Sequence, residues 1–137
     1  MSTGIDQLKH FLLYHAPALG YAALIIFMSS IPGYELPSAP FLNGDKLVHA
    51  LEFGLFGMLL FRAVRFPPLC QSPFRLALAL GIPFAATDEI HQLFVPGRSC
   101  DILDFLADCA GIILFAWISS RQHPMPAPPI HQEFITP

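Results

Sequence analysis

Residues 47–66 read LVHALEFGLFGMLLFRAVRF, an apolar run about as long as the roughly 20 residues that an α-helix needs to cross the hydrocarbon core of a membrane. Three further stretches of similar character lie at about 11–31, 74–95 and 102–119. Proline and glycine pairs separate the four: Pro32-Gly33, Pro67-Pro68 and Pro96-Gly97. The sequence therefore predicts an all-α polytopic membrane protein with four transmembrane helices in a compact bundle.

The composition supports membrane residence. Hydrophobic residues make up 54% of the 137 and charged residues only 12%, whereas a soluble domain carries about 25% charged residues. The formal net charge of −3 is too small to indicate a nucleic-acid partner, so the expected partner is the lipid bilayer. We expect one domain over 1–121 and a proline-rich, disordered tail over 122–137.

The basic residues predict an orientation. Five of them flank one face of the predicted bundle (Lys9, Arg62, Arg65, Arg75 and Arg121), and Lys46 and Arg98 flank the other. Because positive residues accumulate on the cytoplasmic side, both termini are predicted to be cytoplasmic. No A-x-A cleavage site follows the first apolar stretch, so we expect it to be an uncleaved helix rather than a signal peptide.

Ionisable residues inside membrane helices are costly and mark functional sites. On the second predicted helix, Asp45, His49 and Glu52 are spaced i, i+4, i+7 and so share one face. The fourth predicted helix repeats this spacing with Asp101, Asp104 and Asp108. On the third, a cluster covers a broader arc and cannot point in one direction; it consists of Asp88, Glu89, His91 and Gln92.

Helical rise places these residues in depth. Glu52, Glu89 and Asp108 each lie about 10 Å inside the outer end of their helices. We therefore predict a layer of three carboxylates and, between the second, third and fourth helices, an outward-opening polar pocket. Nearer the surface we expect His49, His91, Gln92 and Asp104, with Arg98 at the mouth.

This residue set is suited to acid–base chemistry or proton relay, because crowded acids hold protons more tightly. We assign the catalytic role to Glu52, Glu89, His49 and Asp88. An anionic cell-envelope ligand would be bound by Arg98, Gln92, Asp101, Asp104, Lys46 and Asp45. Mixed histidine and carboxylate ligands also suit a divalent cation; the sequence leaves open whether a metal binds, any cofactor and the oligomeric state.

Other interpretations of single residues stay open. Asp45 and Asp101 occupy N-cap positions and would then act only as caps. Lys46 would be an interfacial lysine with its charge in water, and Arg98 would pair with Asp101 or Asp104. The glycines of the second and fourth helices would be close-packing points; they are Gly54, Gly57 and Gly111.

Four short motifs in register resemble the VanZ-like family of small membrane proteins. They are Asp45-Lys46-Leu47-Val48-His49 with Glu52-Phe53-Gly54, then Thr87-Asp88-Glu89-Ile90-His91-Gln92, then Pro96-Gly97-Arg98, and finally Asp101 to Asp104 with Gly111. One difference is that the family commonly has asparagine where this chain has Asp108, so a neutral group usually serves there.

The resemblance implies a bacterial inner-membrane protein, and the family's named member is linked to resistance to the glycopeptide teicoplanin. It does not imply a reaction, so whether the chain is an enzyme stays open. Three functions follow as alternatives: action on a cell-envelope molecule at the outer face, a structural or assembly protein whose polar network only orders the bundle, and a proton-linked transporter or flippase component.

Overall fold

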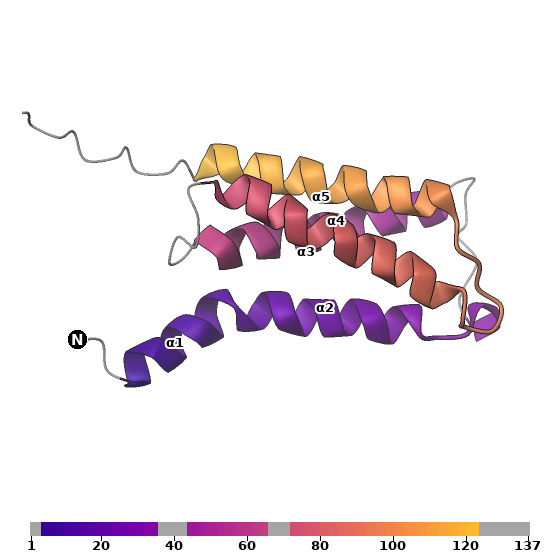
Figure 1. The fold of residues 1–137 in the computed structure, drawn as a ribbon, viewed down its shortest axis with the longest axis horizontal. Helices are drawn as coiled ribbons and strands as arrows, with labels where there is room; N and C mark the ends of the chain where they lie inside the picture. The colour runs from indigo at the N-terminus through magenta and orange to yellow at the C-terminus, as the bar shows by residue number, and fades with distance from the viewer. Residues whose placement is uncertain (1–3, 36–43, 66–71, 124–137) are drawn as a thin grey trace, which may run out of the picture.

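The computed structural model describes residues 4–35, 44–65 and 72–123. In these ranges it contains five α-helices, one short 3-10 helix (η1, Gly33–Glu35) and no strand. Helices α3, α4 and α5 pack side by side, and the α1–α2 pair lies along one side of them (Figure 1). The all-α prediction is confirmed. The predicted tail, from 124 onward, lies outside the described residues.

The first predicted helix, 11–31, is wrong as a single element. The chain forms α1 (Gly4–Tyr14) and α2 (Ala16–Ser29), bent by 43° at His15. Pro17 explains the break, because it has no N–H to donate to the carbonyl of Leu13 and its ring crowds that carbonyl. Helix α2 packs inward along one stripe of buried residues, Ala18, Ile25 and Ser29.

The remaining helices match the predicted stretches with shifted ends. Helix α3 spans Gly44–Arg65, α4 spans Pro73–Gln92 and α5 spans Ile102–Gln122. Because α3 begins at Gly44, Asp45 lies inside its first turn, and its predicted role as N-cap is wrong. Asp101 is the N-cap of α5, where its carboxylate accepts from the amide of Leu103 at 2.8 Å. Helix α4 ends three residues before the predicted 95.

Two described helices, α3 and α5, are long and apolar enough to cross a membrane, and the bent α1–α2 pair is a third candidate. At about 1.5 Å per residue, α3 and α5 are each roughly 30 Å long, which matches the hydrocarbon core. Helix α4 is not among these candidates, because it carries Arg75, Asp88 and Glu89 within its 20 residues. The four-span bundle is thus not confirmed by length and composition.

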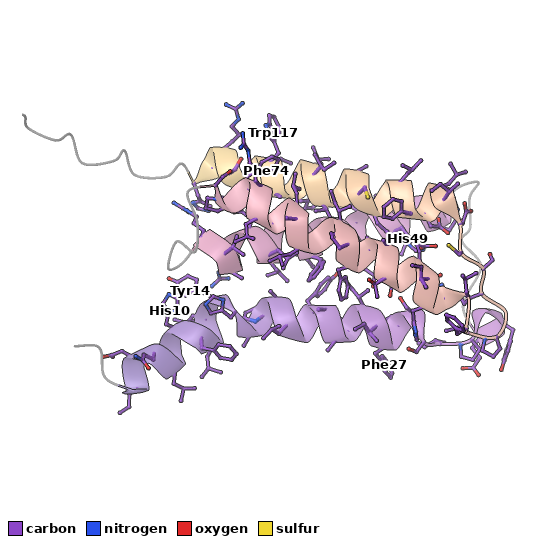
Figure 2. All side chains as sticks on the ribbon, viewed as in Figure 1. His10, Tyr14, Phe27, His49, Phe74 and Trp117 are labelled. Atoms are coloured by element: carbon purple, nitrogen blue, oxygen red, sulfur yellow. The ribbon has the colours of Figure 1, made fainter. Side chains whose placement is uncertain are left out.

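An aromatic core joins α3 and α4. The rings of Phe56 and Phe84 lie 4.8 Å apart, and Phe53 packs edge-on to Phe56 at 6.4 Å. Large apolar side chains elsewhere face outward, among them Phe27 and Trp117 (Figure 2). Such an exterior suits lipid contact rather than water.

Candidate functional site

The site begins with a close approach of α3 and α5. A Cβ on Gly111 would overlap the carbonyl oxygen of Ala50, and one on Gly57 would lie 2.8 Å from Cα of Ile112. The predicted packing role of these glycines is confirmed. Because the two backbones nearly touch, the polar residues on the facing sides of α3 and α5 are brought within bonding distance.

Lys46 holds three acids at this end of the bundle. Its Nζ lies 2.6 Å from Asp104, 2.9 Å from Asp101 and 3.0 Å from Asp45. Its side chain is 20% exposed, so the ammonium pairs with these acids while part of the side chain still reaches solvent. The Lys46 ammonium and the Leu103 amide hold the pKa of Asp101 below its usual range.

Deeper in the same face, three side chains from three helices meet. His49 on α3, Glu89 on α4 and Asp108 on α5 each offer a ligand atom, and these atoms all lie within 4.8 Å of one another. His49 Nδ1 lies 3.0 Å from Asp108 Oδ1, and its Nε2 lies 4.0 Å from Asp104. Glu89 Oε2 accepts a hydrogen bond from the Asp101 amide at 3.0 Å. We call this set the His49–Glu89–Asp108 cluster.

The predicted layer of carboxylates is only partly correct. Glu89 and Asp108 do come together, but His49, predicted nearer the surface, joins them in place of Glu52. Glu52 is half-buried one turn further along α3, within electrostatic range of His49, Asp88 and Asp108. The distance of His49 from the end of its own helix did not predict this position, because the packing of α3 against α5 places His49 level with Asp108.

Asp88 faces a different neighbour from Glu89, as expected for adjacent helical residues. It accepts from Ser29 of α2 at 2.8 Å and from Gln92 at 3.2 Å. It also lines a cavity of about 150 Å³ between α2 and α4, with His91 at its edge. His91 Nε2 lies 3.0 Å from the Ser30 hydroxyl. Asp88 and His91 therefore contact the end of α2, and Gln92 contacts Asp88, rather than joining the cluster.

Arg98 also binds α2. Its Nε donates to the carbonyl of Ile31 at 3.3 Å and its Nη2 to that of Met28 at 3.2 Å, both at the carboxyl end of that helix. The alternative in which Arg98 pairs with Asp101 or Asp104 is wrong, because among the described residues its guanidinium bonds these carbonyls and forms no ion pair with either acid.

A backbone joint lies beside Arg98. The Gly33 amide donates to the Pro96 carbonyl at 3.0 Å, and Gly97 adopts φ +74°, which favours glycine. A Cβ on Gly33 would overlap the Gly97 carbonyl. The two connections can dock this closely only because both residues are glycine.

Three buried carboxylate oxygens have no hydrogen-bond partner among the described residues: Asp88 Oδ1, Glu89 Oε1 and Asp108 Oδ2. Glu89 is 2% exposed and Asp108 0%. Buried polar atoms are nearly always bonded, so an unpaired one needs an explanation. Such oxygens can take a proton, a cation or a donor group of a ligand.

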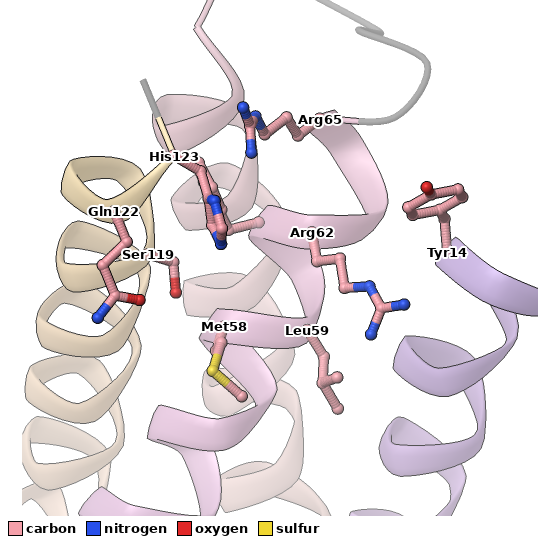
Figure 3. A pocket seen from close by; sticks show the side chains of 9 residues that line it. Tyr14, Met58, Leu59, Arg62, Arg65, Ser119, Gln122 and His123 are labelled. Carbon is pink, nitrogen blue, oxygen red and sulfur yellow. The ribbon is translucent and has the colours of Figure 1, made fainter. Parts of the chain in front are cut away.

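The opposite end of the bundle holds a different cavity, of about 370 Å³, lined by residues of α1, α3 and α5 (Figure 3). Its polar lining includes Tyr14, Arg62, Arg65, Gln122 and His123. The Arg62 guanidinium lies 5.5 Å from the centre of the Tyr14 ring. The arginines contributed to the predicted membrane orientation of the chain. The cavity was not predicted, because side chains distant in sequence form it.

Ser29 and Ser30 were also missed. The signal was present, since two hydroxyls close an otherwise apolar stretch directly before Pro32-Gly33. They are the α2 partners of Asp88 and His91.

These features define a helical membrane protein with a buried histidine and carboxylate cluster near one end of its bundle. A model of the VanZ/LLP1 family matches residues 8–122. The chain therefore belongs to the VanZ-like family, and the predicted resemblance is confirmed. No curated protein and no solved structure gave a match.

Proposed function

We propose that this chain acts on an anionic cell-envelope molecule at the outer face of the bacterial inner membrane, and that it contributes in this way to glycopeptide (teicoplanin) resistance. The observation that carries the proposal is the His49–Glu89–Asp108 cluster: three helices each bury an ionisable group at one place. Burial of two acids with unpaired oxygens is expensive, and groups of this kind gather where chemistry or binding requires them.

The proposal includes four membrane spans: the α1–α2 pair, α3, α4 and α5. Helix α4 would cross because its acids face protein rather than lipid; Asp88 and Glu89 are both buried. The basic end, with Arg62 and Arg65, would be cytoplasmic together with both termini. The end with Lys46 and Arg98 would then face outward.

A reporter fused after residue 137 tests this orientation. A cytoplasmic terminus gives a fluorescent green fluorescent protein fusion and an inactive alkaline phosphatase fusion. The reverse pair of results would overturn the orientation and with it the outer-face action.

In the proposed site, His49 and Glu89 exchange protons with the ligand, Glu52 assists from the next turn of α3, and Asp88 contributes from the side of α4 that faces α2. Arg98 has five N–H donors and uses two on carbonyls, which leaves donors for an anionic group. Lys46, Gln92, Asp45, Asp101 and Asp104 form the surrounding polar wall.

A purely structural network is the second candidate, supported by the three ion pairs of Lys46. Against it, a network that exists only for stability should leave few buried oxygens unpaired, because each costs about 1–3 kcal/mol. The proton-linked transporter is the third; proton flux into proteoliposomes that is lost in Glu89→Gln would favour it over the other two.

Teicoplanin susceptibility of a sensitive host tests the proposal. Cells express the wild type, Glu89→Gln, Arg98→Ala or the control Glu35→Gln, and the membrane abundance of each protein is measured. Glu35 is a matched control because it is an exposed carboxylate near the same end of the bundle. We expect Glu89→Gln and Arg98→Ala to lose protection at unchanged abundance, and Glu35→Gln to protect like the wild type.

Other outcomes contradict specific parts. Full protection by both site variants would overturn the role of the site. Falling abundance in step with lost protection would favour the structural network. A wild type that gives no protection would overturn the resistance role.

A further inference from the structure

We propose that the His49–Glu89–Asp108 cluster binds one divalent transition-metal cation, such as Zn²⁺ or Mn²⁺. The inference deepens the proposed function because it concerns the same site, but it can be tested without any resistance measurement. Its basis is the meeting of one imidazole and two carboxylates, from α3, α4 and α5, with their ligand atoms within 4.8 Å of one another.

The unpaired oxygens are a second and independent observation. Glu89 and Asp108 are almost wholly buried, and each has one oxygen in use and one without a partner among the described residues. The used oxygens accept from the Asp101 amide and face His49 Nδ1. Each carboxylate is thus held in orientation through one oxygen while the other remains available as a ligand.

Charge balance also favours a cation. The cluster contains two carboxylates, and Asp104 lies 4.0 Å from His49. Lys46, the neighbouring cation, is already bonded to Asp45, Asp101 and Asp104. Within the described contacts, therefore, the only positive charge beside Glu89 and Asp108 would be a protonated His49, and a divalent cation would balance both acids in their ionised form.

The donor set selects the class of metal. Imidazole nitrogen with carboxylate oxygen suits Zn²⁺, Mn²⁺ or Fe²⁺, whereas Mg²⁺ and Ca²⁺ prefer oxygen ligands alone. Three protein ligands leave coordination positions open, as in catalytic rather than structural zinc sites. The Asp101 amide that bonds Glu89 would act as the outer partner that orients a ligand.

Protons shared among the three groups are the competing explanation for the same geometry. The two explanations differ in a measurable way, because a proton-sharing cluster does not retain a metal through dialysis. They also differ in how added metal changes stability, since a ligand stabilises the fold only if it binds the folded state.

Metal content of the purified full-length protein in detergent is the primary test. Purification uses a peptide epitope instead of a polyhistidine tag, followed by chelator treatment, incubation with ZnCl₂ or MnCl₂, dialysis and elemental analysis. The variants are His49→Gln, Glu89→Gln and Asp108→Asn. The controls are His91→Gln and Glu35→Gln, a histidine and an acid outside the cluster at the same end of the bundle.

We expect one equivalent of metal in the wild type and in both controls, with affinity lowered more than tenfold in each cluster variant. As a second measurement, the same metal should raise the melting temperature of the wild type but not that of Glu89→Gln. Glu89→Gln and Asp108→Asn preserve the side-chain shape, so we expect both variants to fold. Their melting temperature without metal shows whether a failure to bind metal comes from unfolding.

A wild type that retains no metal would overturn the inference, as would binding that all three cluster variants preserve or that His91→Gln abolishes. These failures are separable from failure of the proposed function. Lost protection in Glu89→Gln with a metal-free wild type leaves the function standing, whereas bound metal with full protection in Glu89→Gln leaves only the metal site.

Discussion

The two ends of the bundle use charged side chains in opposite ways. At the end that contains Lys46 and Asp104, most of the charged side chains are half-buried, and close ion pairs join α3 to Asp101, Asp104 and Asp108. At the other end, Arg62 is exposed and stacks on Tyr14 beside an open cavity. His49 and Tyr14 mark the two regions in Figure 2.

The difference follows from how closely the helix backbones approach. Where Gly111 meets Ala50, there is no room for water, so charges must pair with one another. Where a cavity separates the helices, long side chains such as that of Arg62 can reach water. The same residue types therefore form a specific cluster at one end and a solvated rim at the other.

Gly111→Ala should prevent the close approach of α3 and α5 that distinguishes the two ends of the bundle. The added methyl group would overlap the Ala50 carbonyl, which forces α3 and α5 apart and separates Lys46 and His49 from their acids. We expect a loss of about 3 kcal/mol in the free energy of unfolding, measured by thermal or denaturant unfolding in detergent. Gly20→Ala is the matched control because nothing lies within 4 Å of its added Cβ. Equal stability of the two variants would refute the close-packing explanation.

Lys46→Met should disrupt the cluster end while preserving the backbone contact. Asp104, whose side chain is 14% exposed, would lose its cation at 2.6 Å, and we expect about 1 kcal/mol less stability. Lys9→Met, which changes an exposed lysine on α1, should be close to neutral. If the two lysine variants unfold alike, the ion pairs of Lys46 contribute nothing.

The pH dependence of stability should reflect the ion pair between Lys46 and Asp101. The pKa of Asp101 is lowered in the folded protein, so its contribution is fully present above the ordinary carboxyl pKa, near about 3.9, and is lost as the pH falls through the lowered value. We expect the melting temperature to drop on acidification below about pH 4. Asp101→Asn preserves the N-cap and should show a smaller drop. An identical profile for both proteins would exclude Asp101 as a source of the effect.

Arg62→Met should have the smallest effect. It removes the contact with the Tyr14 ring at 5.5 Å, which is worth about 0.5 kcal/mol at an exposed site. Unfolding measured beside Lys46→Met gives a direct comparison of the two ends. A cost as large as that of Lys46→Met would mean that the basic end is as specifically built as the cluster end.

Most of the fold was predictable from the sequence because a helix that crosses lipid needs a long apolar run, and such runs are visible in residues 47–66 and 102–119. The 3.6-residue period also placed His49 and Asp108 on the inner faces of their helices. Proline at position 17 was visible too, but the first helix was predicted as one element over 11–31, whereas the chain breaks at His15. A proline at position 83 leaves α4 continuous, so the presence of proline does not by itself determine whether a helix breaks.

The partners of the site residues were less predictable. Whether Asp88 or Glu89 joins His49 depends on the rotation of α4 relative to α3 and α5. That rotation is set by packing between surfaces far apart in sequence, such as Phe56 against Phe84. The partners of Arg98 could not be predicted either, because they are backbone carbonyls, which every residue has and which no side-chain pattern identifies.

The joint between Gly33 and Pro96 has a consequence for the order of assembly. The chain is made from its N-terminus, and Arg98 follows Ile31 by 67 residues, so α2 is synthesised long before its docking partners exist. Until then, the carbonyls of Met28 and Ile31 lack the Arg98 guanidinium as a donor. Residues 96–98 can therefore dock on the end of α2 only late, after α3 and α4 have been synthesised. Until that step, these contacts do not hold α2 against the rest of the bundle.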